Sequence, residues 1–450
     1  MSLIASSHLI VVVGLGVTGL SVARFLRHQQ KSFVLMDSRA VPPNMDIIRR
    51  EFSEYRCITG GLDTDLLLQA SEIIVSPGIS IKTPAIVAAI NAGIPVIGDI
   101  ELFARHVNVP VIAITGSNAK STVTTLVGDM AKQANIHVAV GGNIGKPVLD
   151  LLLNDTGIEL YVLELSSFQL EVTSSLKAIA ASVLNVCHDH MDRYDSFAQY
   201  HLAKQRVYWG ATTIVINRDD PLTQPPVAQG VQVISFGFGP SDKQGFGLMT
   251  IDGQEQLAFQ FKPLLPVTAL ALKGRHNIAN ALAALALGHA AGIAIEPMLE
   301  VLTTFAGLEH RCQHVRTLNQ IDYVNDSKAT NVGATLAAIN GFSRGDKNII
   351  LVAGGQAKEA DFSPLLDVLE QSVRAVIVMG EDAGQIATVI GDRLPCHVVG
   401  TMLDAVKKAN DVAVIGDTVL LSPACASFDQ YSGFKARGEH FIDIVMGLAP

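Results

Sequence analysis

The sequence predicts an α/β protein with three domains, each built on a mostly parallel sheet. Short apolar runs alternate with helical stretches along the chain, which is typical of parallel sheets covered by helices on both faces. At 450 residues the chain is too long for one ordinary core, and its length suggests about three domains. Two glycine-containing turns, at residues 14–19 and 115–121, each follow an apolar run that opens a new series of such units.

We expect the domains to span residues 1–98, 99–307 and 308–450. The first and third are predicted to be Rossmann-like, and the central one to be P-loop ATPase-like. The expected strands are 8–13, 33–36, 71–75 and 94–97 in the first domain, 111–114, 160–164, 181–186 and 213–217 in the second, and 349–353, 375–379, 397–399 and 418–421 in the third. Sheets of this kind bind ligands beyond the carboxyl ends of their strands.

Charge, cysteine content and hydropathy argue against several classes of protein. The net charge of −9 disfavours a general nucleic-acid binder, which would carry a basic face. The five cysteines form no CxxC pair, so a reducing cytoplasm fits better than a disulfide framework. The N-terminus lacks a basic region and a cleavage site, so we expect no signal peptide. Residues 280–295 are apolar but contain His289 and two glycines, which predicts a buried helix and no membrane span.

The turn at residues 14–19 has the pattern G-x-G-x-x-G, and Asp37 ends the next expected strand. In a dinucleotide-binding unit these glycines let the backbone approach a pyrophosphate, and the acid holds a ribose. The same interactions can bind any nucleotide diphosphate, so UDP and NAD are both possible ligands. A tight strand–helix turn without a ligand is the alternative.

The second turn reads TGSNAKST and resembles a phosphate-binding loop. Lys120 and Ser121 stand where such a loop places its phosphate lysine and its magnesium hydroxyl. The spacing G-x-x-x-K-S is shorter than the usual G-x-x-x-x-G-K-[ST], and Ala119 replaces the glycine before the lysine. If that position needs a positive φ, alanine costs about 1–2 kcal/mol there. An ordinary helix cap is the alternative.

Further candidate groups follow later strands of the middle domain. Glu164 ends an expected strand and can hold Mg²⁺, although it can equally be an acid at a helix N-terminus. The segment CHDHMDRY contains two histidines and two aspartates, but a tight zinc site would need ligands elsewhere, and His190 can also be an ordinary loop residue. Lys204 lies on a helical segment, where a lysine is normally a solvated charge.

Together these segments resemble the Mur ligase family of ATP-dependent amide-bond ligases. The matching segments are TGSNAKST, LELSSFQLE, NVCHDHMDRYDSFAQYHLAKQRVY, KGRHNIANALAALAL, GLEHRCQHV and NDSKATN, in order along the chain. GLGVTGLS with Asp37, VSPGI, GGNIGKP and SPACASFDQYSGFKARGEHF look like the family member that adds D-glutamate. The resemblance implies ligation of D-glutamate to UDP-N-acetylmuramoyl-L-alanine through an acyl phosphate, in peptidoglycan synthesis.

The resemblance also implies a role for particular residues. Those expected to bind ATP are Gly116, Ser117, Asn118, Ala119, Lys120, Ser121, Thr122, Asn277, Asn280, Arg311, Asp326 and Lys328. Those expected to bind the UDP-linked substrate are Gly16, Val17, Thr18, Asp37, Arg39, Ser76, Pro77, Gly78, Asn143 and His190. Those expected to bind D-glutamate are Thr330, Lys358, Ser427 and Phe434.

The same resemblance implies two Mg²⁺ ions, held by Ser121, Glu164, His190 and Lys204. Lys204 would act as a carbamate formed with CO₂, which turns a cation into an anionic oxygen ligand. The catalytic set implied is Lys120, His190, Lys204, Arg311 and Lys328. The expected partners are small molecules only, with no nucleic acid and no membrane, and we expect a cytoplasmic monomer.

Other functions remain open from the residues alone. An NAD-dependent oxidoreductase would use the first glycine turn but leaves TGSNAKST and NDSKATN without a role. Another amide ligase of the same superfamily, such as a folylpolyglutamate synthase, should lack the first domain or the C-terminal segment. A nucleotide-binding regulator with a loop disabled by Ala119 is the non-enzymatic alternative.

Overall fold

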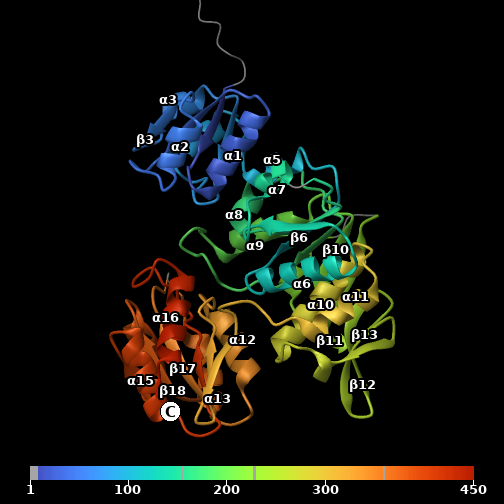
Figure 1. Ribbon diagram of the computed structural model, residues 1–450, viewed down its shortest axis with the longest axis vertical. Helices are drawn as coiled ribbons and strands as arrows, with labels where there is room; N and C mark the ends of the chain where they lie inside the picture. The colour runs from blue at the N-terminus through green and yellow to red at the C-terminus, as the bar shows by residue number, and fades with distance from the viewer. Residues whose placement is uncertain (1–8, 155, 227–229, 358–359, 450) are drawn as a thin grey trace, which may run out of the picture.

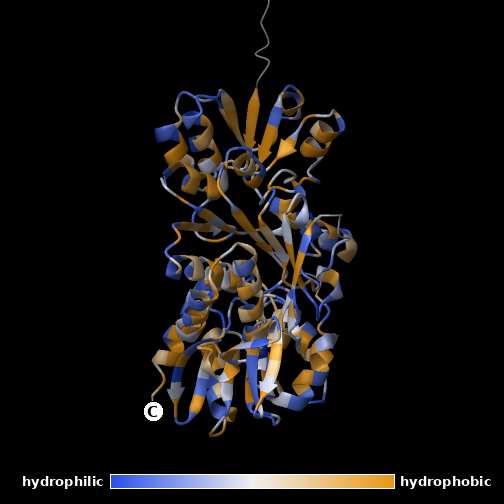
Figure 2. Cartoon of the chain, turned by 90° about the vertical axis from the view of Figure 1, so that its right-hand side faces the viewer, coloured by the Kyte–Doolittle hydropathy of each residue, from blue (hydrophilic) through white to orange (hydrophobic). Residues whose placement is uncertain are grey.

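The computed structural model describes residues 9–154, 156–226, 230–357 and 360–449. Three separate sheets follow one another along the chain, with helices packed on both faces of the parallel regions (Figure 1). The apolar residues concentrate in the strands and on the inner faces of the helices (Figure 2). The three-domain α/β architecture predicted from the sequence is therefore confirmed.

The first sheet is parallel throughout, with the strand order β3-β2-β1-β4-β5. Its strands are β1 Ile10–Val13, β2 Phe33–Asp37, β3 Cys57–Thr59, β4 Glu72–Val75 and β5 Val96–Ile97. Its helices are α1 Val17–His28, α2 Met45–Glu51, α3 Thr64–Leu68 and α4 Pro84–Asn91. The strand order reverses beside β1, so the carboxyl end of β1 opens onto the crevice where ligands of such sheets bind.

The middle sheet has the order β14-β13-β12-β11-β10-β9-β6-β8-β7. Its strands are β6 Val111–Thr115, β7 Val138–Gly142, β8 Leu160–Glu164, β9 Ala180–Val183, β10 Thr213–Asn217, β11 Gln232–Pro240, β12 Gly245–Ile251, β13 Gln254–Phe259 and β14 Lys262–Pro266. Its helices are α5 Asp99–Ala104, α6 Lys120–Gln133, α7 Val148–Asn154, α8 Ser167–Glu171, α9 Phe197–Gln205, α10 Arg275–Ala290 and α11 Ile295–Thr304. The antiparallel extension from β12 to β14 was not expected, because these strands carry less regular apolar patterns.

The third sheet has the order β15-β16-β20-β17-β18-β19 and is parallel except for β15. Its strands are β15 Gln313–Leu318, β16 Ile321–Asn325, β17 Ile349–Gly354, β18 Val373–Met379, β19 Cys396–Val398 and β20 Thr418–Leu421. Its helices are α12 Val332–Phe342, α13 Leu366–Ser372, α14 Ala383–Ile390, α15 Met402–Val412 and α16 Phe434–Met446.

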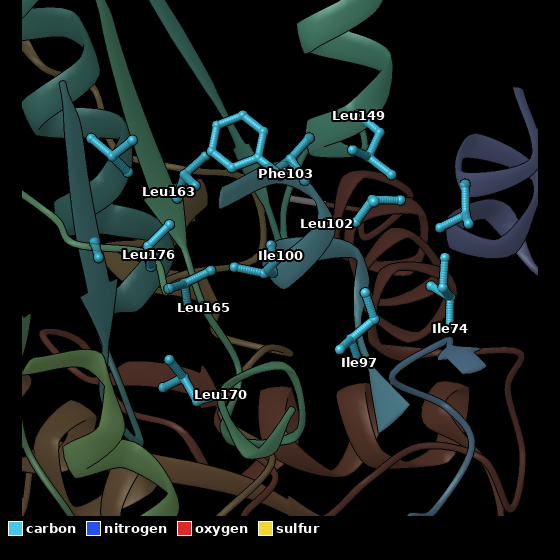
Figure 3. Packing of buried hydrophobic residues seen from close by; sticks show 14 of the residues in the cluster. Ile74, Ile97, Ile100, Leu102, Phe103, Leu149, Leu163, Leu165, Leu170 and Leu176 are labelled. Atoms are coloured by element: carbon cyan, nitrogen blue, oxygen red, sulfur yellow. The ribbon is translucent and has the colours of Figure 1, made fainter. Parts of the chain in front are cut away.

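The first and middle domains share one apolar cluster around α5. Ile100, Leu102 and Phe103 lie between Ile74 of the first sheet and Leu163 of the middle sheet (Figure 3). α1 and α7 also meet, and Ser21 donates a hydrogen bond to Asp150 across that contact, at 2.8 Å. Burial of this apolar surface fixes α5 as the joint between the two domains.

The apolar stretch expected at residues 280–295 is the buried helix α10, Arg275–Ala290. It begins earlier than expected because Gly274 is its N-cap, and Arg275, His276 and Asn277 form its first turn. In the described part of the chain, no helix combines the length and apolar character needed to cross a membrane.

Candidate active site

The phosphate-loop candidate lies between β6 and α6, at the carboxyl edge of the middle sheet. Its shape is fixed by Asn185, which follows β9. The Asn118 N–H donates to the Asn185 side-chain oxygen at 2.8 Å, and the Asn185 amide donates to the Asn118 carbonyl at 3.2 Å. Ser117 in turn bonds the Cys187 carbonyl at 3.0 Å and the Tyr200 hydroxyl at 2.9 Å. The loop is therefore held in place before any ligand binds.

Ala119 adopts the left-handed conformation that the sequence left undecided. It is the N-cap of α6 with φ 66° and ψ −5°. For a residue with a Cβ this conformation costs about 1–2 kcal/mol relative to glycine. The loop therefore carries backbone strain at the residue that precedes its lysine.

Two buried lysines meet at the Gly116 carbonyl. Lys120 Nζ and Lys204 Nζ each donate to this oxygen at 2.8 Å. Lys204 is 2% exposed, so the expectation of a solvated lysine on a helix surface is wrong. α9 turns this face inward, and Nζ lies 4.5 Å from the ring centre of Tyr200. Burial, helped by the charge of Lys120, places the pKa of Lys204 well below its ordinary value.

Glu164 is the acidic centre of the site. It ends β8 beside β6 and is 2% exposed. One carboxylate oxygen accepts from Asn143 at 2.7 Å, and the other accepts from the Ser121 hydroxyl at 2.6 Å. Arg311, from the segment before the third sheet, donates to the same hydroxyl at 2.7 Å. Among the described residues Glu164 makes no ion pair, so its buried charge is free to hold a cation.

The acid–histidine segment borders the phosphate loop. Asp189 accepts the backbone N–H of His190 at 2.9 Å, and its second oxygen lies 3.8 Å from His190 Nε2. The His190 ring packs on Phe168 and lies 6.4 Å from the ring of Tyr200, whose face also meets Lys204. Within the described residues no three His, Cys, Asp or Glu side chains group as a metal cluster. A zinc-type site built from this segment alone is therefore not present there.

A cavity of about 690 Å³ opens between the middle and C-terminal domains. It is lined at one side by the phosphate loop and α10 and at the other by α12 and the segment before β15. The predicted nucleotide residues that it brings together are Asn118, Ala119, Thr122, Asn277, Asn280, Arg311, Asp326 and Lys328.

Two of these cavity residues have strongly shifted pKa values. Burial lowers the pKa of Lys328 to about 8, assisted by the charges of Arg311 and Lys120. Its Nζ lies 4.0 Å from the ring centre of Phe434. Burial raises the pKa of Asp326 to about 7, although Ser422 and the Cys312 N–H donate to its carboxylate. Shifts of this kind cluster where charge is used for binding or catalysis.

The D-glutamate candidates gather at the carboxyl edge of the third sheet. Ser427 is buried after β20, and Phe434 begins α16, where its carbonyl accepts from Ser327 at 2.8 Å. The Thr330 N–H donates to the carbonyl of Lys328, which lines the cavity, at 2.8 Å. Lys358 lies outside the described residues.

The first glycine turn forms as predicted, but Asp37 is occupied within the protein. A Cβ on Gly19 would lie 1.9 Å from the Gly14 carbonyl, so only glycine permits this approach of helix and turn. Asp37 accepts from the Leu15 N–H at 2.6 Å and from the Arg39 guanidinium at 2.7 and 2.9 Å. The Arg39 side chain is half exposed. Gly78 lines a separate hollow of about 560 Å³.

The sequence analysis missed several residues that hold the site together. Asn185 shapes the phosphate loop, the Tyr200 ring lies near both His190 and Lys204, and Asn331 joins three segments. Arg437 is buried and donates to Ser327 and to the carbonyls of Gly354, Cys425 and Ala426. Asn331 could have been found as an N-cap directly before an apolar helical run.

Family models match in three consecutive regions. They are described as Mur ligase MurD-like, N-terminal domain (residues 8–98), Mur ligase middle domain (residues 114–288) and Mur ligase, glutamate ligase domain (residues 310–425). The chain belongs to the Mur ligase family.

Curated relatives align over the whole chain. Proteins named UDP-N-acetylmuramoylalanine--D-glutamate ligase from Pseudomonas fluorescens Pf-5 and Pseudomonas aeruginosa PAO1 are each 52% identical over 450 residues, covering 100% of both chains. The protein of that name from Marinobacter nauticus is 48% identical over 448 residues, again with 100% of both chains covered.

Solved structures share the fold. A pseudomurein peptide ligase type C from Methanothermus fervidus matches with TM-score 0.60 and 18% identity, covering 98% of this chain and 99% of that one. The UDP-N-acetylmuramate-alanine ligase MurC from Thermotoga maritima matches with TM-score 0.59 and 17% identity, covering 97% and 99%.

The strain at Ala119 predicts the effect of a substitution. Ala119→Gly should raise the free energy of unfolding by up to about 1 kcal/mol, because relief of the left-handed strain exceeds the added flexibility of the unfolded chain. Thermal unfolding measures the change. Ala134→Gly, at the other end of α6 with φ −82°, is the control and should lower stability slightly. Equal losses for both variants would contradict the assignment of strain to Ala119.

Proposed function

We propose that this chain is the ligase that joins D-glutamate to UDP-N-acetylmuramoyl-L-alanine, with ATP cleaved to ADP and phosphate, in peptidoglycan synthesis. The observation that carries the proposal is the cavity lined by Arg311 and Lys328. It borders the phosphate loop that carries Lys120 and Ser121, and Ser121 bonds to both Arg311 and the carboxylate of Glu164. The full-length relatives, at about half identity, carry the name of this activity.

The reaction needs an activated carboxylate, since a free carboxylate has a poor leaving group. The L-alanine carboxylate attacks the γ-phosphorus of ATP, the bond from that phosphorus to the bridging oxygen breaks, and ADP leaves. The amine of D-glutamate then attacks the carbonyl carbon of the acyl phosphate. It loses a proton, the amide bond forms, and phosphate departs with the electron pair of the broken C–O bond.

The first step brings two anions together, so cations must offset their repulsion. Lys120 lies in the phosphate loop and is held there by the Gly116 and Ser117 carbonyls, both at 2.8 Å. Arg311 and Lys328 approach from the C-terminal side of the cavity. Because all three side chains are partly buried, water screens their charges less than it would at the surface.

The residues around Glu164 fit a Mg²⁺ ion. Ser121 and Glu164 supply a hydroxyl and a carboxylate oxygen, the hard ligands that Mg²⁺ takes, and the carboxylate has no cationic partner within the described chain. A bound Mg²⁺ would neutralise phosphate charge. Ser121 and Glu164 would hold it, and Asn143 would keep Glu164 oriented.

We further propose a second Mg²⁺ held by His190 and by Lys204 as a carbamate. Carbamate formation requires a neutral amine, and burial shifts the pKa of Lys204 downward, in the direction that favours one. The carbamate would also place an anion beside Lys120. His190 and Lys204 both border the Tyr200 ring, which supports their acting together.

The UDP-linked substrate would lie across the first two domains. The backbone of Gly16, Val17 and Thr18 opens α1 and offers unpaired N–H groups to a diphosphate. Asp37 would act through Arg39, which it orients, and Ser76, Pro77 and Gly78 would border the uridine. Asn143 would contact the substrate where the first domain meets the middle one.

D-Glutamate would bind at the edge of the third sheet, held by Thr330, Lys358, Ser427 and the backbone of Phe434. Lys328 lies between this edge and the phosphate loop, which would place the amine near the acyl phosphate. We propose that the protein acts as a cytoplasmic monomer on small molecules and binds neither nucleic acid nor membrane.

Phosphate release from ATP tests the proposal. With UDP-N-acetylmuramoyl-L-alanine, release should occur with D-glutamate and fall to background with L-glutamate, L-lysine, meso-diaminopimelate or no amino acid. Release with a different amino acid would support the ligase activity but identify a different amino-acid substrate. No release with any amino acid would overturn the proposal and favour a nucleotide-binding regulator.

Lys204→Ala should lower kcat by about 10²-fold or more, because an anionic metal ligand is lost. Added acetate or formate should restore part of the rate by supplying a carboxylate in the vacated space. Lys204→Arg is the matched control: it keeps a long cationic side chain, cannot form the carbamate and should not respond to acetate. Full activity of Lys204→Ala without a carboxylate would contradict the carbamate role.

The pKa of Lys328, lowered to about 8, predicts that activity decreases at alkaline pH. A lysine is charged below its pKa, so kcat/KM for ATP should fall as pH rises through about 8, where Lys328 loses its proton. Lys328→Arg should lower the rate but move this decrease in kcat/KM to a pH at least about 1 unit higher, since arginine stays charged. If the decrease occurs at the same pH in that variant, another group is responsible for it.

A further inference from the structure

The first turn of α12 lies unusually close to the phosphate loop and the acid–histidine segment. A Cβ on Gly333 would lie 2.7 Å from Cys187 Sγ and 3.4 Å from the Asn118 side-chain nitrogen. At the other end of α12, a Cβ on Gly341 would lie 2.7 Å from the His276 ring. This helix of the C-terminal domain is therefore docked along the wall of the cavity, and its glycines permit the approach.

Asn331, the N-cap of α12, bonds to three segments through one buried side chain. It is 7% exposed, and its amide oxygen accepts the Ala334 N–H at 2.8 Å, which caps the helix. Its amide nitrogen donates to the Asn118 side-chain oxygen at 3.1 Å and to the Asp189 carboxylate at 3.0 Å. Both amide hydrogens and the amide oxygen of Asn331 therefore form hydrogen bonds.

Asn118 and Asp189, the two side chains that accept from Asn331, belong to two different loops of the candidate site. Asn118 belongs to the phosphate loop, two residues before Lys120, and its backbone is already fixed by Asn185. Asp189 directly precedes His190 and accepts its backbone N–H. A single side chain from the C-terminal domain therefore contacts the phosphate loop and the acid–histidine segment at the same time.

We propose that Asn331 is a positioning residue that sets these two loops in register with the C-terminal domain, an inference that rests on the proposed ligase activity. It touches no reacting atom in this arrangement. It acts by fixing Asn118 and Asp189 relative to Lys328 and Thr330, three and one residues before it on the same strand-to-helix connection. Small displacements between reacting groups cost large factors in rate.

Two substitutions at Asn331 separate capping from positioning. Asn331→Asp and Asn331→Ser both keep an oxygen that can cap α12. Asn331→Asp loses the donors and sets a second carboxylate against Asp189, so kcat should fall about 10-fold or more with a smaller change in KM for ATP. Asn331→Ser removes the donors without the repulsion and should show an intermediate loss of kcat.

A cap of another helix provides the matched control. Thr401 caps α15, far in the sequence from the cavity segments, and accepts the Asp404 N–H at 3.2 Å. Thr401→Ala should lower Tm by about 2–4 °C through the lost cap. Its kcat and KM should match those of the unsubstituted protein, because no cavity contact changes.

A reciprocal exchange tests the contact with Asp189. In the double variant Asn331→Asp with Asp189→Asn, the donor and acceptor trade places, so the contact can re-form. The double variant should have a higher kcat than Asn331→Asp alone. The inference would be overturned if both Asn331 variants were as active as the Thr401→Ala control. It would also be overturned if the double variant were no more active than Asn331→Asp alone.

Amide hydrogen exchange in the ligand-free protein distinguishes failure of this inference from failure of the proposed function. Asn331→Asp should speed exchange at residues 116–122 and 187–190, whereas Thr401→Ala should not. Faster exchange in a protein that ligates no D-glutamate would support the positioning role and reject the function. Unchanged exchange and unchanged kcat would reject the positioning role alone.

Discussion

The carbonyl oxygen of Gly116 accepts hydrogen bonds from the side-chain nitrogens of Lys120 and Lys204. Neither lysine has an ion pair within the described chain, and burial lowers both pKa values. A cation at this position is costly unless an anion offsets its charge. Hydrogen bonds to Asn185 and Tyr200 hold the loop backbone and Ser117, so the acceptor that the two lysines share is fixed in place. The folded middle domain therefore favours an anion beside the phosphate loop.

The remaining groups of the site follow from sheet geometry and from the position of the third domain. β8 lies beside β6, so Glu164 reaches Ser121 at the carboxyl edge that both strands share. Arg311 and Lys328 come from a part of the chain about two hundred residues later, and they complete the cation set only because α12 is docked beside the phosphate loop. The cationic side chains around the cavity thus come from two domains, so their arrangement depends on the contact between these domains.

The sequence predicted the parallel strands well because buried strands are continuous apolar runs ending at loop residues. The strands β11–β14 were missed because their apolar patterns are less regular, and β12 contains Gly245 and Gly247. The strands β3, β7, β15 and β16 were also missed. The motifs named candidate site residues, but they could not show which partner each one bonds. The burial of Lys204, the left-handed Ala119 and the internal bonding of Asp37 depend on packing between distant segments, which spacing along the chain does not record.

The fold itself cannot select the amino acid that is joined. Solved proteins whose names describe different peptide ligations share this architecture at 17–18% identity, over nearly the full length of each chain. Under the proposed function, the selection lies in side chains at the carboxyl edge of the third sheet. There Arg437 donates to the carbonyls of Gly354, Cys425 and Ala426 and so ties the loops after β17 and β20 to each other. The buried guanidinium therefore holds together the two loops that border the proposed D-glutamate site.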